Sequence, residues 1–357
     1  MAPPLAGPFS GQNFPPARAA EGFAVPDRSS STAAPSQVLL RPAASMPASL
    51  TAINPEGVVR EFHDLMNRSG DVAVAVAAIA ALTSVIRASE SSTIMGLERE
   101  LREAAAALQR CNPTAISLAA GCDLFLRYTT RSSALEASGD FATVKRRLIA
   151  RGQRFAETSK RARATIAELG ERFVRPGSTV LVHGHSRVVL SLLRRAAADG
   201  IRFSAVVTEG RPDETGLSMA RALREVAADV TVILDAAVAH GMERVDLVLV
   251  GAEAVAENGG VINKLGTYGV ALAAKAHGVP VYVAAESYKF ARLYPLRQAD
   301  LPAERKQVDF GPLLPPDVLV DNPSRDYTPP KYISLLFTDL GVLTPAAVSD
   351  ELIQLYS

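Results

Sequence analysis

The sequence is poor in cysteine and in aromatic side chains. Its 357 residues include two cysteines and no tryptophan, and aromatic residues make up 6% of the chain. Two thiols, Cys111 and Cys122, cannot build a disulfide framework and are typical of a protein that stays in a reducing compartment. The scarcity of aromatic rings argues against a surface that binds nucleic acid by stacking on its bases. We therefore expect a cytoplasmic protein with no direct nucleic-acid partner.

Net charge and long apolar runs are also lacking. Lys plus Arg total 38 and Asp plus Glu total 37, so the formal net charge of +1 implies no global attraction to an anionic membrane. The longest apolar run, residues 72–82, falls short of the roughly 18 residues that a membrane-spanning helix needs. No G-x-G-x-x-G follows an expected strand, and no G-x-x-x-x-G-K-[ST] occurs, so dinucleotide or Walker-type nucleotide binding is not indicated. The balanced charge and the short apolar runs together predict that the protein has no membrane partner.

Proline is distributed unevenly along the chain. Ten of the 23 prolines lie in residues 1–55, a segment that is also rich in alanine and serine. This composition predicts a disordered extension over residues 1–54. The arginines Arg18, Arg28 and Arg41 leave a mitochondrial presequence as the alternative, although the prolines argue against the amphipathic helix that such a leader needs.

Residues 55–175 have the pattern of helices without strands. Val72, Val76, Ile79, Thr83 and Ile86 recur every three or four residues, as on one face of a helix. Similar apolar stripes follow, and the longest runs over residues 141–173. We expect an all-helical N-terminal domain that ends near residue 175.

From residue 176 onward, short apolar runs alternate with segments of helix length. Such strands, apolar on both faces and separated by 10–15 residues, are typical of a parallel sheet that helices cover on both sides. The predicted fold class is α/β, with the helical domain followed by a Rossmann-like, mainly parallel sheet domain over residues 176–357. The expected strands are 179–183, 203–208, 230–234, 247–250, 281–284 and 333–337.

Polar and charged residues gather where these strands end. In open parallel sheets, ligands bind beyond the carboxyl ends of the strands. Glycine-rich loops there lead into expected helix starts at Ser186 and Thr267, and helix N-termini bind phosphate through free N–H groups. The candidate residues of a phosphate or sugar-phosphate pocket are His183, His185, Ser186, Arg187, Glu209, Arg211, Glu253, Asn263, Lys264 and Thr267.

A plainer interpretation exists for most of these residues. His183 and His185 form an H-x-H pair, but no Cys or third His lies at matching spacing, so we expect no metal site. Residues 258–260, Asn-Gly-Gly, are read most simply as a turn. Each charged residue at a strand end, taken alone, could belong to a solvated loop. Their convergence at several strand ends favours a pocket.

The expected long helix carries an excess of basic residues. Ten Lys and Arg residues lie between positions 141 and 175, opposed by three glutamates. One interpretation is a solvated helix face. The other is a docking surface for an acidic or phosphorylated protein, with Arg147, Arg151 and Arg154 as candidate contacts.

Several motifs are specific enough to indicate a family. Residues 183–190 read H-G-H-S-R-V-V-L, residues 250–253 read V-G-A-E, and residues 257–267 read E-N-G-G-V-I-N-K-L-G-T. Together with residues 284–290 and 335–345, they resemble the alpha-subunit family of eukaryotic translation initiation factor 2B, over about residues 55–357. The resemblance implies a regulatory subunit of the guanine-nucleotide exchange factor for translation initiation factor 2. It implies a homodimer that joins two copies of the subcomplex of beta, gamma, delta and epsilon subunits, and that helps sense the phosphorylated alpha subunit of factor 2.

The same fold family includes isomerases of ribose 1,5-bisphosphate and of methylthioribose 1-phosphate. The resemblance implies that their catalytic cysteine position is Gly184 here and that their aspartate position is Glu253. Without a side chain at Gly184, we expect no enzyme activity and no required cofactor. A vestigial pocket would still bind a sugar phosphate, a nucleoside monophosphate, or phosphate or sulfate. An active aldose–ketose isomerase is the alternative.

Overall fold

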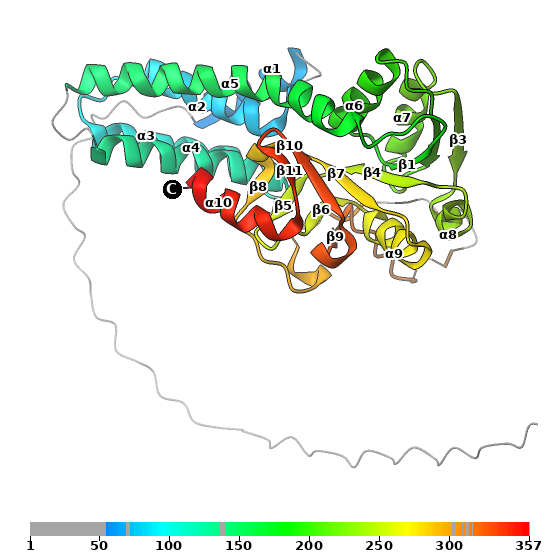
Figure 1. Ribbon diagram of the computed structural model, residues 1–357. Helices are drawn as coiled ribbons and strands as arrows, with labels where there is room; N and C mark the ends of the chain where they lie inside the picture. Colours follow the sequence, from blue (N-terminus) through cyan, green and yellow to red (C-terminus); the bar gives the residue numbers. More distant parts are fainter. Residues whose placement is uncertain are drawn as a thin grey trace, which may run out of the picture. The chain divides into compact units, whose positions relative to one another are not determined.

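The computed structural model describes residues 55–68, 72–135, 140–301, 304–306, 308, 310, 314–315 and 317–356 (Figure 1). The expected disordered extension, residues 1–54, lies outside the described residues. The contacts group the described residues into one compact unit. The boundary expected between residues 175 and 176 falls just after the long helix α5, and the extents of the predicted domains stay predictions.

Five helices form the first part of the described chain, and no strand precedes residue 179 there, as the sequence predicted. The second helix is buried on nearly every side: its small alanines at positions 75, 77, 78 and 81 are buried, and so are Ile79, Leu82 and Ile86. Its neighbours pack their leucines around it in one apolar cluster. The helices are α1 (Pro55–Arg68), α2 (Val74–Ala88), α3 (Ile94–Cys111), α4 (Ile116–Leu135) and α5 (Phe141–Glu171).

Seven strands form a large sheet in the order β11-β10-β7-β4-β1-β2-β3. Every neighbouring pair is parallel except β10 with β11, so the predicted α/β fold class is confirmed. The strand order reverses between β1 and β4, which is the topological switch point of the sheet. The strands are β1 (Thr179–His183), β2 (Ser204–Thr208), β3 (Asp229–Ile233), β4 (Leu247–Gly251), β7 (Val281–Ala284), β10 (Leu335–Thr338) and β11 (Gly341–Leu343).

Helices cover both faces of this sheet. Successive residues of a strand point to opposite faces, so Val180 and Val182 enter one apolar cluster and Leu181 enters the other. The first cluster includes residues of α6 (Arg187–Ala198) and α7 (Thr215–Leu223). The second includes residues of α8 (Val238–Met242), α9 (Thr267–His277) and α10 (Val348–Tyr356).

The long helix α5 joins the helical part to the sheet. Its Ile166 and Ala167 belong to the same apolar cluster as α6. Gly170 lies directly against Leu192 and Phe337, where a Cβ atom would collide with both side chains. In Figure 1, α5 extends from the other helices to α6 at the sheet. The helical part therefore contacts the sheet domain through the end of α5.

A second, smaller sheet was not predicted from the sequence. It consists of β5 (Ala254–Ala256), β6 (Val261–Lys264), β8 (Phe290–Ala291) and β9 (Arg325–Thr328), in the order β8-β5-β6-β9. The Asn-Gly-Gly segment, expected as a turn, connects β5 to β6, and Gly259 has the positive φ of 81° that such a tight turn requires. Strands of two to four residues are too short to show an alternating pattern, which explains why they were missed.

Short 3₁₀ turns complete the described chain. The helix expected near residue 235 consists of such a turn followed by α8. The turns are η1 (Asp235–Ala237), η2 (Ser287–Lys289), η3 (Gln298–Asp300), η4 (Pro330–Tyr332) and η5 (Pro345–Ala347).

Candidate functional site

A cavity of about 290 Å³ lies at the switch point, beyond the carboxyl ends of β1 and β4. This is the position where open parallel sheets bind ligands. The helical part covers it with the start of α2 and the connection between α3 and α4. The structure brings six of the ten predicted pocket residues into its lining, namely His185, Ser186, Arg187, Glu253, Asn263 and Lys264.

The start of α6 forms one wall of this cavity. The Ser186 hydroxyl accepts a hydrogen bond from the Val189 N–H at 3.3 Å and so caps the helix. Gly251, at the end of β4, allows this close approach, because a Cβ atom there would lie 2.5 Å from Ser186 Oγ. The guanidinium group of Arg187 donates to the Val72 carbonyl at 3.2 Å, which ties the wall to the helical part.

Lys264 and Arg325 converge on one carboxylate at the floor of the cavity. Lys264 Nζ lies 3.5 Å from Glu253 Oε1 and donates to Asp213 Oδ2 at 2.6 Å. Arg325 Nε pairs with the other oxygen of Glu253, and Arg325 Nη1 donates to the Thr114 carbonyl at 2.8 Å. Glu253 therefore holds two cations in place at the expected ligand position.

A second ionic cluster lies at the carboxyl end of β7. The buried Glu286 contacts Lys289 Nζ at 2.8 Å and Arg163 Nε at 3.5 Å, and its Oε1 accepts a hydrogen bond from the Tyr288 hydroxyl. Burial opposes ionisation of Glu286, but the Lys289 ammonium and the hydrogen bonds more than compensate, so its pKa is lowered to about 2. Burial and the neighbouring Glu286 raise the pKa of Tyr288, which stays a protonated hydrogen-bond donor.

The charges of the lining favour an anion. Two carboxylates, Glu253 and Glu286, oppose four cationic side chains. Lys289 Nζ also donates to the Ala252 carbonyl at 2.9 Å, which directs it to the cavity side of β4. A surplus of cations in a partly enclosed cavity suits a phosphate group. The four cations are Arg187, Lys264, Lys289 and Arg325.

Gly184, the predicted counterpart of the isomerases' cysteine, precedes His185 in the loop after β1. The His185 side chain is exposed, with Nδ1 3.1 Å from Ser218 Oγ. Burial, and to a lesser extent Arg187, lower its pKa, so the ring is neutral near pH 7. Gly184 has φ of 70°, and a Cβ there would lie 3.5 Å from Lys264 and Thr215. The backbone conformation, rather than a lack of space, disfavours a side chain at this position.

His183 lies outside the cavity lining. It is buried, its Nε2 is 2.8 Å from the Leu265 carbonyl, and its Nδ1 is 2.6 Å from Thr208 Oγ1. A carbonyl accepts only, so Nε2 carries the proton and Nδ1 accepts from the hydroxyl. Burial lowers the pKa of His183, which keeps the ring neutral. His183 thereby connects β1, β2 and the start of α9.

Thr267 also lies outside the lining. Its hydroxyl donates to the Lys264 carbonyl at 2.7 Å and accepts from the Asn263 amide at 3.1 Å. The N–H groups of Gly266 and Tyr268, at the start of α9, donate to Asp326 Oδ2 at 2.8 and 3.1 Å. The chain's own carboxylate thus occupies the helix start that the sequence analysis assigned to phosphate.

Glu209 and Arg211 pair with each other outside the cavity. Arg211 lies 3.6 Å from Glu209 and 3.1 Å from Glu214, and Asp235 accepts hydrogen bonds from the N–H groups of Gly210 and Arg211. These contacts hold the loop after β2. A role of Glu209, Arg211, His183 and Thr267 in phosphate binding stays a prediction.

Asp326 supplies a prediction of pH dependence. Burial raises its pKa to about 7, although two N–H groups bind its ionised form. Between about pH 4 and pH 7 the folded chain holds a proton there that the unfolded chain has lost, so stability falls as the pH rises. The free energy of unfolding should therefore fall by at most about 1.4 kcal/mol per pH unit in this interval, and we expect Asp326→Asn to remove this dependence.

Urea unfolding at pH 5, 6 and 7 measures this slope. The exposed Asp229 supplies the matched control, Asp229→Asn. An identical slope in the wild type and in Asp326→Asn would contradict the assignment.

The basic residues of α5 lie away from the cavity. Arg147, Arg151 and Arg154 are exposed and follow each other at a spacing of four and three residues, which places them on one helix face. Arg163, further along α5, instead reaches the ionic cluster around Glu286. The helix that bears the predicted docking face is therefore linked to the cavity. Docking at these arginines stays a prediction.

Two absences concern the described part of the chain. Within it, no group of three or more His, Cys, Asp or Glu residues is arranged to hold a metal ion. Within the same residues, no helix combines the length and the apolar character that crossing a membrane requires.

Sequence reasoning missed four of the charged residues at the site. Asp213, Glu286, Lys289 and Arg325 lie outside the strand ends used for the prediction. Glu286 and Lys289 follow the end of β7, so the rule that located the other candidates applies to them as well. Arg325 follows a segment without a strand pattern, and no signal in the sequence indicates it.

Comparison with known proteins agrees with this fold. A model of the Initiation factor 2 subunit family matches residues 67–345. The chain is 45% identical over 310 residues to translation initiation factor eIF2B subunit alpha of Dictyostelium discoideum, a match that covers 84% of this chain and 96% of that protein. It is 35% identical over 268 residues to ribose 1,5-bisphosphate isomerase of Archaeoglobus fulgidus, which covers 74% of this chain and 83% of that protein. The crystal structure of the Pyrococcus horikoshii OT3 translation initiation factor eIF-2B has a TM-score of 0.65 at 26% identity, covering 82% of this chain and 98% of that chain.

Proposed function

The chain belongs to the Initiation factor 2 subunit family, and from this premise we propose that it is an alpha-type regulatory subunit of the guanine-nucleotide exchange factor for translation initiation factor 2. The observation that supports this proposal most strongly is the 45% identity, over most of both chains, to a protein named as that subunit. In this proposal the chain forms a homodimer in the cytoplasm, which joins the beta, gamma, delta and epsilon subunits. The homodimer helps the assembly respond to the phosphorylated alpha subunit of factor 2.

We propose further that the switch-point cavity binds a ligand without converting it. Its surplus of cations favours a sugar phosphate, a nucleoside monophosphate, or phosphate or sulfate. Isomerisation moves a proton between neighbouring carbons and needs a titratable side chain at the reacting atoms. Gly184 has none, and the carboxylate of Glu253 is engaged by Lys264 and Arg325.

The alternative is an active sugar-phosphate isomerase, because a ribose 1,5-bisphosphate isomerase is also a relative. We expect no turnover when the purified chain is incubated with ribose 1,5-bisphosphate or with methylthioribose 1-phosphate. The product is measured by chromatography against an active isomerase as the positive control. Turnover at ordinary enzymatic rates, about 1 per second or faster, would establish the alternative instead.

Ligand binding itself is tested by thermal unfolding. Ribose 1,5-bisphosphate at about 100 times its Kd should stabilise the chain by about 2.7 kcal/mol, which raises Tm by about 5 °C or more. We expect Lys264→Ala to abolish this rise, because Lys264 is one of the four cations of the lining. For each variant, the Tm with ligand is compared with the Tm of the same variant without ligand. An effect of the substitution on the basal Tm therefore does not enter the comparison.

The exposed Lys275 on α9 supplies the control for that experiment. Lys275→Ala removes the same charge outside the cavity and should retain the full rise. An equal rise in Lys264→Ala and Lys275→Ala would place the ligand elsewhere.

A further inference from the structure

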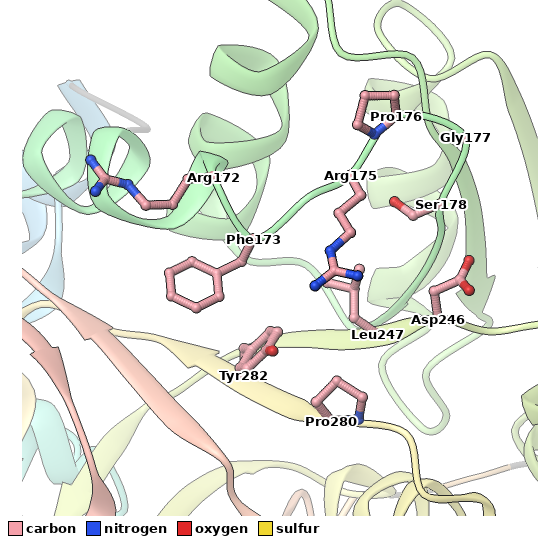
Figure 2. A pocket seen from close by; sticks show the side chains of 10 residues that line it. All are labelled: Arg172, Phe173, Arg175, Pro176, Gly177, Ser178, Asp246, Leu247, Pro280 and Tyr282. Carbon is pink, nitrogen blue, oxygen red and sulfur yellow. The ribbon is translucent and has the colours of Figure 1, made fainter.

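A second cavity opens at the opposite edge of the large sheet. It has a volume of about 730 Å³ and lies where β1, β4 and β7 begin, next to the end of α5 (Figure 2). Its size falls within the roughly 300–1,000 Å³ of ordinary small-molecule sites. It shares none of its lining residues with the switch-point cavity.

A tight turn between α5 and β1 presents two polar side chains at this cavity. The turn runs from Arg175 to Ser178, whose N–H donates to the Arg175 carbonyl at 3.1 Å. Pro176 suits the second position of such a turn, and Gly177 has the positive φ of 80° that the third position of a type II turn requires. The local sequence therefore determines where Arg175 and Ser178 lie.

The two side chains have no partner within the described part of the chain. Ser178 is 7% exposed, and its Oγ is buried without a hydrogen bond there. Arg175 is exposed and forms no ion pair with the described residues. Figure 2 shows the Arg175 side chain directed toward Leu247, with the Ser178 oxygen on the side that faces Arg175. A buried hydroxyl without a partner is costly, and a ligand oxygen would satisfy it.

Apolar side chains form the rest of the wall. The rings of Phe173 and Tyr282 pack edge to face, with centroids 5.4 Å apart, and both contact the buried Phe337. Leu247 and Pro280 line the cavity beside them, and the Tyr282 hydroxyl adds a donor. The wall is thus rigid and suits the ring of a small molecule.

Asp246 is the one acidic residue of this lining. Its Oδ2 accepts a hydrogen bond from the Thr179 N–H at 2.7 Å. Figure 2 shows its carboxylate directed away from Arg175. Asp246 therefore leaves the guanidinium group of Arg175 available for an anion.

We propose that this cavity is a second ligand site, which takes a phosphate monoester of a ring-bearing small molecule. Three separate donors, from Arg175, Ser178 and Tyr282, match the three terminal oxygens of a phosphate, whereas a carboxylate offers two. Arginine binds phosphate oxygens in a planar, bidentate arrangement. The apolar wall of Phe173, Leu247 and Pro280 covers the ring.

Calorimetric titration with AMP tests the proposal on the full chain. Because the switch-point cavity also suits phosphate, the titration is made in the Lys264→Ala background, which weakens binding there. We expect AMP to bind in this background, and Arg175→Ala to weaken that binding about tenfold or more. Ser178→Ala and Tyr282→Phe should weaken it less, and adenosine, which lacks the phosphate, should not respond to Arg175→Ala.

Arg202 supplies the matched control, because it is exposed, lies next to the turn and is absent from the cavity lining. Arg202→Ala should leave AMP binding unchanged. Arg175 is exposed, so Arg175→Ala should keep the basal Tm, which shows that the variant folds. No AMP binding at millimolar concentration in the Lys264→Ala background, or equal binding with and without Arg175, would overturn the proposal.

Discussion

Replacing Glu286 with glutamine is expected to lower the free energy of unfolding by about 3 kcal/mol and Tm by roughly 5–10 °C. Glu286 is 2% exposed and compensates two cations, Lys289 at 2.8 Å and Arg163 at 3.5 Å. Glutamine keeps the volume but removes the negative charge that compensates both cations in a poorly solvated position. Urea unfolding at pH 7 measures the difference.

The pH dependence distinguishes this ion pair from simple packing. The pKa of Glu286 is lowered to about 2 in the folded chain, so its contribution is fully present above about pH 5. It is lost as the pH falls toward 2, because the folded carboxylate must then be protonated. The wild type should lose stability over this interval, and Glu286→Gln should lose less.

Glu103→Gln is the matched control for this experiment. Glu103 forms an exposed pair with Arg99, and such pairs contribute about 0–1 kcal/mol. Equal destabilisation by Glu103→Gln and Glu286→Gln would contradict a special role of the buried cluster. In a double-mutant cycle, Lys289→Gln should restore part of the stability lost in Glu286→Gln.

Reversing the charges of Arg147, Arg151 and Arg154 to glutamate is expected to weaken binding of the phosphorylated alpha subunit of factor 2 about tenfold to a hundredfold. These arginines lie on one exposed face of α5, where a phosphorylated or acidic partner gains several favourable pairs. The measurement is the Kd of the assembled exchange factor for the phosphorylated partner. The loss should shrink at high salt, because exposed charges are screened.

A second triple variant of equal charge change controls for net charge. Arg221, Arg224 and Arg244 are exposed and lie in the α/β part, away from α5. Their reversal to glutamate should leave the Kd unchanged. If the α5 variant binds the partner as the wild type does, the basic face of α5 is a solvated helix surface and not a docking surface.

Much of the fold could be predicted from the sequence, because the signal is local. Short apolar runs, the three residues 180–182 and the four residues 247–250, indicate strands buried on both faces, and both became central strands of the sheet. The helical stripe that includes Ile79 and Ile86 became the buried helix α2. The small sheet escaped prediction, since its strands are short and β9 pairs with a partner about 60 residues earlier.

The candidate site was predicted only in part, because some of its residues come from segments that are distant in the sequence. His185, Ser186 and Lys264 were found because they follow strands whose ends meet at the switch point. Arg325 was missed because it reaches the cavity from the small sheet, whereas Glu286 follows β7 and falls under the same rule of strand ends. Their partners, Glu253 and Arg163, lie 72 and 123 residues away in the sequence.

By itself the sequence determined the helical first part, the parallel strands of the large sheet, the family resemblance and the edge at which charged residues gather. These depend on composition and on periodicities of two or 3.6 residues, which are properties of short segments. Only the tertiary structure decided which cations share a carboxylate, that Asp326 occupies the start of α9, and that a second cavity with Arg175 opens at the other edge. Such pairings arise when distant segments pack together, and no local pattern encodes them.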